Sequence, residues 1–184
     1  MRGRAATTAL VPVANGTEEM EAVIVIDVLR RAGVDVCVAS IEDSKMVCCS
    51  RSVNIMADEL LGDVSENFDA IVLPGGMPGA ERLRDSSKLI DMLKVQQKEG
   101  RIYGAICAAP AVVFQPNGLL DGKVATCHPG FMEGLENASE KRVVVQDNCI
   151  TSRGPGTAFE FALALVKELL GEEKAEEVAN PMVL

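Results

Sequence analysis

Short apolar runs alternate along this chain with longer segments in which apolar residues recur every three or four positions. The short runs, which end at glycine, proline or asparagine, predict buried strands. The longer segments predict amphipathic helices. The predicted strands are residues 7–13, 34–40, 68–76, 101–106, 123–127 and 142–152, and the predicted helices are residues 17–32, 86–99, 108–115, 155–171 and 171–180.

The first predicted helix has clear boundary signals. It follows the segment NGTEEM, in which Asn15 or Thr17 is the candidate N-cap, and Gly33 supplies a C-terminal stop. The stripes expected to be buried are Met20, Val23, Ile24 and Val28 in this helix, Leu89, Ile90, Leu93 and Val95 in the second, and Phe159, Leu163, Val166 and Leu170 near the C-terminus.

Two segments predict antiparallel pairs instead of single strands. Residues 48–56 alternate weakly and predict an extended hairpin arm. Residues 142–152 predict a hairpin that turns at Asp147 and Asn148.

Strands that are apolar on both faces and alternate with helices predict a mostly parallel sheet covered on both sides, which is a doubly wound α/β fold. The chain has 184 residues and no linker or internal repeat, so we expect a single domain over residues 1–184. Ligands of such folds bind beyond the carboxyl ends of the strands. The loops of interest are therefore NGTEE, LPGGMPG, AICAAP, TCHPG and TSRGPGT.

Composition and charge narrow the classes of function. Hydrophobic residues make up 48% of the chain and charged residues 24%, which is typical of a globular protein. The 18 basic and 27 acidic residues give a net charge of −9, so we expect no nucleic-acid partner. No apolar run reaches the roughly 18 residues of a membrane span, and we expect no membrane association. The basic opening MRGRAATT is interpreted as a disordered end instead of a transit peptide.

Six cysteines lie at irregular spacings, with no C-x-x-C motif and a single histidine. This pattern argues against a zinc site. It is typical of a protein from a reduced compartment, and we expect a cytoplasmic location, with an organelle left open as an alternative.

Cys107 stands where a predicted strand meets a predicted helix, in the segment YGAICAAP. Pro110 suits the first turn of that helix, because the N–H that proline lacks has no partner there. A thiol at the start of a helix has its thiolate stabilised by the helix dipole and by free N–H groups, which lowers its pKa and makes it a better nucleophile. The alternative is a core cysteine, since free cysteines are among the most buried residues.

Other residues with chemical potential are expected at the same edge of the sheet. Gly75 and Gly76 end a strand, where they form either an oxyanion-binding backbone or a simple tight turn. Glu21 turns toward the sheet from the first helix, where a protonated carboxyl would hydrogen-bond a thiolate. His128 is the sole imidazole and is either catalytic or structural. Arg153 either holds an anion or pairs with a carboxylate.

Four segments together resemble the ThiJ/PfpI superfamily, and within it the branch of the human parkinsonism-associated protein. They are EEMEAVIVIDVLRRAG, VLPGGMPGA, GAICAAP and TSRGPGTAFEFALALV, and the similarity runs in order through nearly the whole chain. The resemblance implies a flavodoxin-like fold that forms homodimers, and we expect no cofactor and no metal ion.

The resemblance also implies roles for particular residues. It makes Cys107 the reactive residue, Glu21 its hydrogen-bonding carboxyl group and His128 the neighbouring histidine. Backbone groups of Gly75, Gly76 and Ala108 are implied as the oxyanion pocket. Two arginines, Arg51 and Arg153, match positions that line the site and hold anions, and Arg51 is expected to reach across the dimer interface.

One departure from the superfamily's peptidases changes the expected activity. The peptidases place a histidine directly after the nucleophilic cysteine, whereas Ala108 stands there in this chain. We therefore expect no peptidase activity.

Two functions compete within this resemblance. The first is a cysteine-dependent, glutathione-independent glyoxalase that converts small dicarbonyls such as methylglyoxal to hydroxy acids, with a related deglycase activity on early glycation adducts. The second is a redox-sensing, chaperone-like protein in which Cys107 is oxidised without turnover. An ionisable thiol serves both functions, so the sequence does not separate them.

Overall fold

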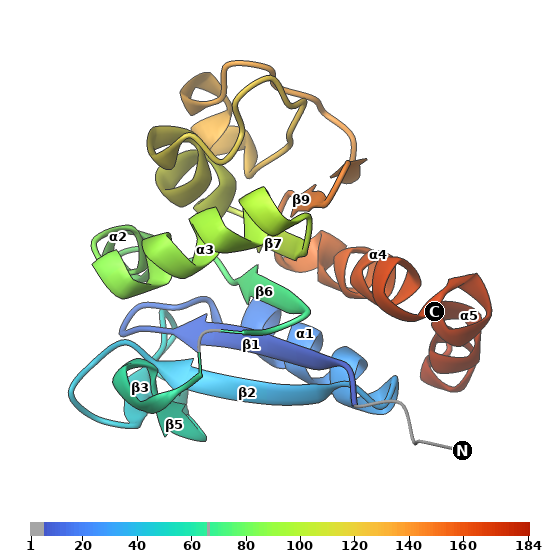
Figure 1. Ribbon diagram of the computed structural model, residues 1–184, viewed down its shortest axis with the longest axis horizontal. Helices are drawn as coiled ribbons and strands as arrows, with labels where there is room; N and C mark the ends of the chain where they lie inside the picture. Colours follow the sequence, from blue (N-terminus) through green and yellow to red (C-terminus); the bar gives the residue numbers. More distant parts are fainter. Residues whose placement is uncertain (1–5, 66) are drawn as a thin grey trace.

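The computed structural model describes residues 6–65 and 67–184, so the basic opening segment falls largely outside the described residues (Figure 1). Within them the main sheet has seven strands, all parallel to their neighbours except β8, which runs antiparallel to β9. In spatial order the strands are β5 (Glu59–Leu60), β2 (Asp35–Ser40), β1 (Thr8–Val13), β6 (Ala70–Leu73), β7 (Ile102–Ile106), β9 (Cys149–Ser152) and β8 (Val143–Gln146).

Helices cover both faces of the sheet, as predicted for a doubly wound fold. On one face, α1 (Glu19–Arg31) packs on β1 and β2, while α4 (Ala158–Leu170) packs on β7, β9 and α1 and is flanked by α5 (Glu172–Ala179). The other face carries α2 (Gly79–Arg84) and α3 (Ser87–Glu99). The order of the five central strands is flavodoxin-like, and the predicted fold class is confirmed.

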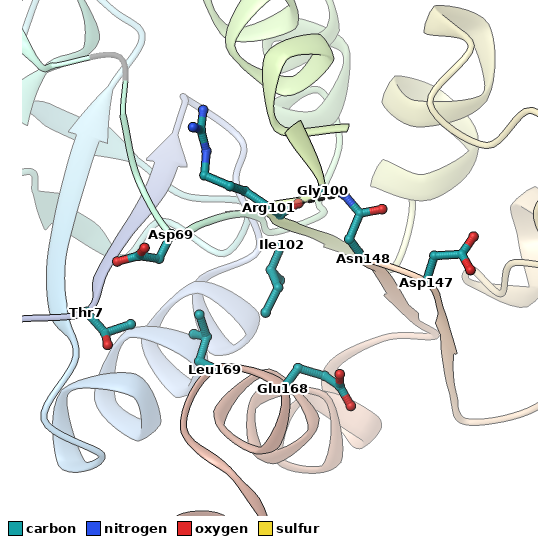
Figure 2. Close-up of a pocket in the computed structure, with 9 residues that line it drawn as sticks. All are labelled: Thr7, Asp69, Gly100, Arg101, Ile102, Asp147, Asn148, Glu168 and Leu169. Atoms are coloured by element: carbon teal, nitrogen blue, oxygen red, sulfur yellow. Dashed lines mark hydrogen bonds between the residues drawn. The ribbon is translucent and has the colours of Figure 1, made fainter. Parts of the chain in front are cut away.

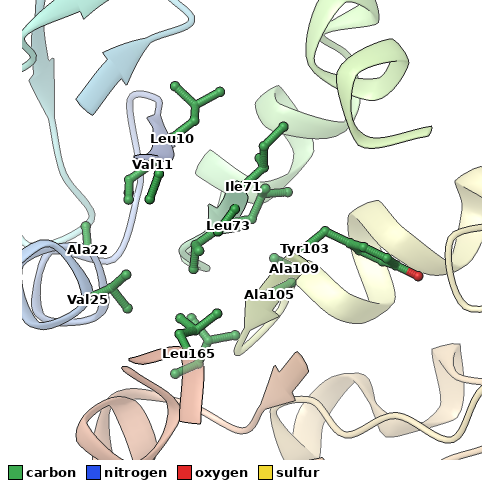
Figure 3. Packing of buried hydrophobic residues seen from close by; sticks show 14 of the residues in the cluster. Leu10, Val11, Ala22, Val25, Ile71, Leu73, Tyr103, Ala105, Ala109 and Leu165 are labelled. Atoms are coloured by element: carbon green, nitrogen blue, oxygen red, sulfur yellow. The ribbon is translucent and has the colours of Figure 1, made fainter. Parts of the chain in front are cut away.

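The core lies between the central strands and these helices (Figure 3). Strands β1, β6 and β7 are buried on both faces, because helices cover each side, and this explains their continuous apolar runs. Tyr103 is fully buried, and its hydroxyl donates to the carbonyl of Leu119 at 2.8 Å. Figure 3 shows side chains of the strands meeting those of α1 and α4; among them are Leu10, Val11, Ile71, Leu73, Ala22, Val25 and Leu165.

The predicted buried stripes of the helices are partly wrong. In α1 the residues Met20 and Val23 are 55% and 50% exposed, whereas Val28 is buried as predicted. The other buried residues of α1 are Ala22, Val25 and Leu29, beside the buried carboxylates Glu19 and Glu21. Both faces of α1 carry apolar residues at three- and four-residue spacing, so periodicity alone does not select the buried one. Val95 of α3 and Phe159 of α4 are likewise exposed.

Residues 123–127 do not form the predicted strand. Ala125 makes only an isolated bridge to Ala138, and the Thr126 N–H donates to the Thr151 side chain at 3.0 Å. Strand β8 pairs with β9 on the side away from β7, so residues 123–127 have no free side of β9 with which to pair.

Two helix starts also differ from the prediction. The N-cap of α1 is Glu18, whose carboxylate accepts from the Glu21 N–H at 2.8 Å, while Thr17 and Asn15 bond other backbone groups. The helix predicted over residues 108–115 is reduced to a π-helical turn at Pro110–Phe114. Strand β5 and helix α2 are short elements that no pattern in the sequence predicted.

Both predicted hairpins are confirmed. Strands β3 (Met46–Cys48) and β4 (Asn54–Met56) pair antiparallel in a sheet of their own. Strands β8 and β9 are joined at Asp147, whose φ of +53° suits a tight turn.

Candidate active site at Cys107

The loops after β1, β6 and β7 meet at the carboxyl edge of the sheet. Strand order reverses between β1 and β6, and this reversal is where flavodoxin-like folds bind ligands. The loops that follow these strands carry Thr17, Gly75 and Cys107. Glu21 reaches the same place from the first turn of α1.

Cys107 occupies a strained backbone position directly after β7. Its φ is +66°, which non-glycine residues rarely adopt, and its side chain is only 9% exposed. Its N–H donates to the Ser152 carbonyl at 3.0 Å, and its carbonyl accepts from the His128 N–H at 2.8 Å. These bonds hold a conformation in which the thiol projects from a sharp corner, as nucleophiles do at strand-to-helix turns.

Glu21 is a fully buried carboxyl group beside this thiol. Its Oε2 accepts from the Gly75 N–H at 2.8 Å, while Oε1 has no hydrogen-bond partner within the described part of the chain. Burial raises the pKa of Glu21 to about 7, and Gly75 and the Cys107 thiol offset only part of that effect. The protonated carboxyl is therefore well populated near neutral pH.

The adjacent glycines Gly75 and Gly76 allow the loop after β6 to approach Cys107 and Glu21 closely. A Cβ on Gly75 would lie 2.6 Å from the Cys107 Cβ and 2.9 Å from Glu21 Oε2. The Gly75 N–H is occupied by Glu21, so its expected role as an oxyanion donor is replaced by a role in holding the carboxyl group. The N–H groups of Gly76 and Ala108 instead act to lower the pKa of the nearby Cys107 thiol.

The thiol is less acidic than the sequence predicted. Burial, followed by the adjacent Glu21 carboxylate, raises the pKa of Cys107 to about 12, against the smaller opposing effect of the Gly76 and Ala108 N–H groups. In place of the expected α-helix, a π-helical turn at Pro110–Phe114 and a 3-10 turn at Gln115–Asn117 follow the thiol. A proton on Glu21 removes the charge repulsion, so the thiol and carboxyl group ionise as a coupled pair.

A pocket of about 390 Å³ opens onto the thiol, with Cys107 and Ala108 in its wall. His128 also lines it, and its Nδ1 accepts from the Gly130 N–H at 3.1 Å, which leaves Nε2 as the nitrogen that bears a proton in the neutral ring. Residues of this pocket that the sequence reasoning did not single out are Glu18, Met20, Ser50, Met77, Phe131 and Pro155.

The two predicted arginines differ in position. Arg51 lines the pocket from the turn between β3 and β4. Arg153 does not line it; its Nη1 donates to the Glu140 carbonyl at 3.2 Å. Its role in holding an anion stays a prediction.

The other cysteines differ in their distance from the site. The Cys48 carbonyl accepts from the Gly16 N–H at 2.8 Å, so Cys48 and Cys49 adjoin the loop after β1. Cys149 begins β9, at the opposite edge of the sheet from Cys107.

A larger pocket, of about 630 Å³, lies at that opposite edge (Figure 2). Its residues precede the strands: Asp69 comes before β6, Arg101 before β7 and Asn148 before β9. Within the described residues its lining contains neither cysteine nor histidine, so it offers no counterpart of the chemistry at Cys107.

The described residues contain neither a group of side chains placed to hold a metal ion nor a helix able to span a membrane. Among residues 6–65 and 67–184, no group of three or more histidine, cysteine, aspartate or glutamate side chains is placed to hold a metal ion. None of the helices in those ranges is both long and apolar enough to cross a membrane.

Comparison with known proteins places these features in context. The model of the DJ-1/PfpI family matches residues 7–168. The chain is 51% identical over 179 residues to Protein DJ-1 homolog B of Arabidopsis thaliana, which covers 95% of this chain and 41% of the relative, so the chain spans less than half of that relative's length.

Two further proteins are similar over nearly their whole length. A Caenorhabditis elegans protein named glutathione-independent glyoxalase DJR-1.2 is 40% identical over 172 residues, covering 91% of this chain and 90% of the relative. The structure of oxidized Toxoplasma gondii DJ-1 superposes with a TM-score of 0.95 at 48% identity, covering 97% of this chain and 98% of that one.

Proposed function

The chain belongs to the DJ-1/PfpI family, and from this premise we propose that it is a cysteine-dependent, glutathione-independent glyoxalase. Its substrates are small dicarbonyls such as methylglyoxal and glyoxal, and its products are hydroxy acids. The same addition chemistry extends to a deglycase activity on early glycation adducts. The observation that carries the proposal is a pocketed thiol at a positive φ, beside a buried carboxyl group whose pKa is raised to about 7.

In the first step the Cys107 thiol passes its proton to the ionised Glu21 carboxylate as the sulfur adds to the aldehyde carbon, and the resulting oxyanion takes that proton to complete a hemithioacetal. Before it is protonated, the oxyanion accepts hydrogen bonds from the N–H groups of Gly76 and Ala108, which lie near the sulfur. A fixed backbone at Cys107 means that these donors need not reorganise during the reaction.

The second step is an internal redox shift. A base removes the hydrogen on the former aldehyde carbon as a proton is delivered to the oxygen of the neighbouring keto group, which gives an enediol. The first carbon's hydroxyl then loses its proton while the neighbouring carbon gains one, so that one carbon is oxidised to a thioester and the other reduced to an alcohol. Glu21 and His128 are the two groups placed to move these protons. Water then hydrolyses the thioester, releasing the hydroxy acid and restoring the thiol.

The test is D-lactate formation from methylglyoxal without glutathione, measured for the wild type and Cys107→Ser. We expect turnover by the wild type and a loss of at least roughly a thousandfold in the variant. Cys37→Ser is the matched control, because Cys37 lies on β2 outside the Cys107 pocket, and it should retain activity. Equal turnover by Cys107→Ser would refute the proposal.

A second candidate function rests on the oxygen-binding geometry at the same sulfur. The Gly76 and Ala108 N–H groups that would hold an oxyanion would equally hold the oxygens of a sulfinate. A family member of known structure is described as oxidized. If fully reduced protein forms no D-lactate, a redox-sensing, chaperone-like role becomes the preferred function.

Peptidase activity is not proposed. The residue after the nucleophile is Ala108, and His128 reaches the pocket from a different loop, where its Nδ1 is occupied by the Gly130 N–H. A local cysteine–histidine pair is therefore missing.

We further propose that two copies assemble through α1 and the β3–β4 hairpin. Val23 of α1 and Met56 of β4 are exposed and line one shared groove, and Met20 of α1 with Met46 and Val53 of the hairpin are exposed as well. Exposed apolar side chains that gather on one surface mark interaction sites. Arg51 belongs to this hairpin, so the interface would lie beside the mouth of the Cys107 pocket.

A further inference from the structure

The pocket that contains Cys107 is lined by apolar side chains from separate parts of the chain. They are Met20 of α1, Met77 of the loop after β6, Phe131 of the 3-10 turn Pro129–Gly134 and Pro155 of the turn before α4. The proposed chemistry uses a thiol, a carboxyl group, an imidazole and N–H donors, and it gives these four side chains no role. Apolar side chains gathered around a hollow are typical of a site that binds an apolar group.

Phe131 is a fixed part of this wall. Its N–H donates to the His128 carbonyl at 2.8 Å, which sets its place in the turn. Its ring meets the His128 ring edge to face, with centroids 6.1 Å apart and planes inclined by 68°. The side chain is partly buried and packs against the hydrophobic core. The ring is therefore a preformed apolar surface beside one of the groups proposed to move protons.

Met77 is an adaptable part of the same wall. It is 39% exposed and directly follows Gly76, whose N–H acts on the Cys107 thiol. An oxyanion held by that N–H therefore lies one residue away from Met77. Methionine is unbranched and polarizable, so it adjusts to ligands of differing shape.

The pocket has more room than methylglyoxal requires. Its volume of about 390 Å³ lies within the range of roughly 300–1,000 Å³ that is typical of sites for drug-sized ligands, whereas methylglyoxal has only a methyl group beside its two carbonyls. Two charged side chains of the wall, Glu18 and Arg51, have opposite signs, so the wall favours neither anions nor cations. Room, apolar lining and balanced charge together indicate a neutral substrate with a larger apolar group.

We infer that the preferred substrates are neutral 2-oxoaldehydes that carry a bulky alkyl or aryl group, and that Phe131 and Met77 select for this group. The inference rests on the proposed glyoxalase function and names the substituent that its substrate carries. The reaction is otherwise the same: R–CO–CHO and water give R–CHOH–COOH, with the aldehyde carbon oxidised and the keto carbon reduced.

The first test compares kcat/KM for isobutylglyoxal and methylglyoxal. Both have an alkyl group on the keto carbon, so the ratio of the two values reports mainly on how the pocket receives that group. We expect a ratio of at least roughly ten in the wild type and a loss of at least roughly fivefold in Phe131→Ala and in Met77→Ser, because each variant removes apolar contact. Phe159→Ala is the matched control: Phe159 is also 39% exposed but lies on α4 outside the pocket, so the ratio should stay unchanged.

The second test requires no turnover. It compares alkylation of Cys107 by N-benzyliodoacetamide and by iodoacetamide, each divided by the rate for free cysteine. In both reactions the thiol loses its proton, a sulfur–carbon bond forms and iodide leaves. Peptide mapping by mass spectrometry distinguishes Cys107 from the other five cysteines. We expect the benzyl reagent to be favoured at least roughly fivefold in the wild type and at least roughly threefold less in Phe131→Ala.

The two tests separate failure of this inference from failure of the proposed function. A wild type without turnover that still favours the benzyl reagent through Phe131 would refute the glyoxalase function and support the apolar site. A wild type with no preference for the larger group in either test would overturn the inference, and so would unchanged ratios in Phe131→Ala, or equal slowing of both partners of a pair. If Phe131→Ala does not fold, the more exposed Met77→Ser decides: a lower ratio supports the inference, and an unchanged ratio refutes it.

Discussion

At the scale of single residues, the site depends on a carboxyl group whose raised pKa keeps much of it protonated near neutral pH. Glu21 has no exposed surface, and only Oε2 is hydrogen-bonded within the described chain, so burial outweighs its stabilising contacts. A neutral Glu21 can donate to a thiolate, an oxyanion or an oxidised sulfur, whereas a charged one repels all three. The protonation of Glu21 thus decides what Cys107 can do.

The raised pKa of Glu21 predicts a particular pH dependence of stability. The folded state binds the proton more tightly than the unfolded chain does, so the stability linked to Glu21 is fully present below about pH 4.5 and is lost as pH rises to about 7. We expect the unfolding free energy of the wild type, relative to Glu21→Gln, to fall by about 3 kcal/mol across this range. Urea unfolding of both proteins between pH 4 and pH 8 measures it.

Subtracting the unfolding free energy of Glu21→Gln from that of the wild type cancels the contributions of the other titrating groups, because both proteins contain them. A difference that stays constant with pH would mean that folding leaves the pKa of Glu21 unchanged. A difference that grows with pH would mean that its pKa is lowered by folding.

A second prediction concerns oxidation of the thiol. Glu21→Ala should accumulate less Cys107 sulfinate than the wild type under mild peroxide, because the donor to the new oxygens is lost. Peptide-level mass spectrometry of Cys107 follows the gain of two oxygen atoms. Equal oxidation of the two proteins would remove Glu21 from this role.

At the scale of elements, the site is built by two loops that interlock. The Glu18 N–H donates to the Gly75 carbonyl at 2.9 Å, which joins the loop after β1 to the loop after β6. Gly76 has a φ of +89°, and a Cβ there would lie 2.4 Å from both Glu18 N and Gly16 O. Backbone atoms occupy that space, so no side-chain movement would make room.

Gly76→Ala and Gly33→Ala form a matched pair. Both glycines have a positive φ, near +89° and +83°, but a Cβ on Gly33 would meet nothing within 4 Å. We expect Gly33→Ala to cost about 1 kcal/mol of unfolding free energy, the penalty of the backbone conformation alone. Gly76→Ala should cost at least about 3 kcal/mol, because the clash adds to it.

Denaturant unfolding gives both free energies, and iodoacetamide labelling of Cys107 reports on the site. Labelling should slow at least roughly tenfold in Gly76→Ala and stay unchanged in Gly33→Ala. Equal effects of the two substitutions would show that close packing of the loops is unimportant.

At the scale of the whole molecule, several of the exposed apolar side chains come from α1 and the β3–β4 hairpin. Val23 of α1 is 50% exposed and Met56 of β4 is 62% exposed, and the two line the same groove. The proposed dimer would remove this surface from water and leave the amino edge of the sheet, shown in Figure 2, uncovered.

Val23→Glu combined with Met56→Glu should convert the proposed dimer to a monomer, because burial of unpaired carboxylates costs several kcal/mol. Sedimentation velocity gives the mass of each protein. Val145→Glu, at a similarly exposed valine on the edge strand β8, is the control and should remain dimeric. A wild type that sediments as a monomer would refute the proposed assembly.

Much of the fold could be predicted from local pattern. Strands β1, β6 and β7 are continuous apolar runs because both faces are covered, and glycines mark the ends of α1 and α3. The predictions that the structure overturned also have physical explanations. The buried face of α1 was misassigned because both of its faces carry apolar residues, and residues 123–127 were assigned to a sheet whose edge β8 already occupies.

For the site, local sequence was enough to identify the chemical groups and their loops: the thiol of Cys107, the carboxyl of Glu21, the imidazole of His128 and the paired glycines after β6. How these groups are used depends on contacts that form only in the folded chain. Folding gave the Gly75 N–H to Glu21, placed Arg51 but not Arg153 in the pocket wall, and brought Met77 and Phe131 into that wall from separate loops. Hydrogen-bond partners, burial and the pKa values that follow from them arise between distant segments, and no local pattern of residues encodes them.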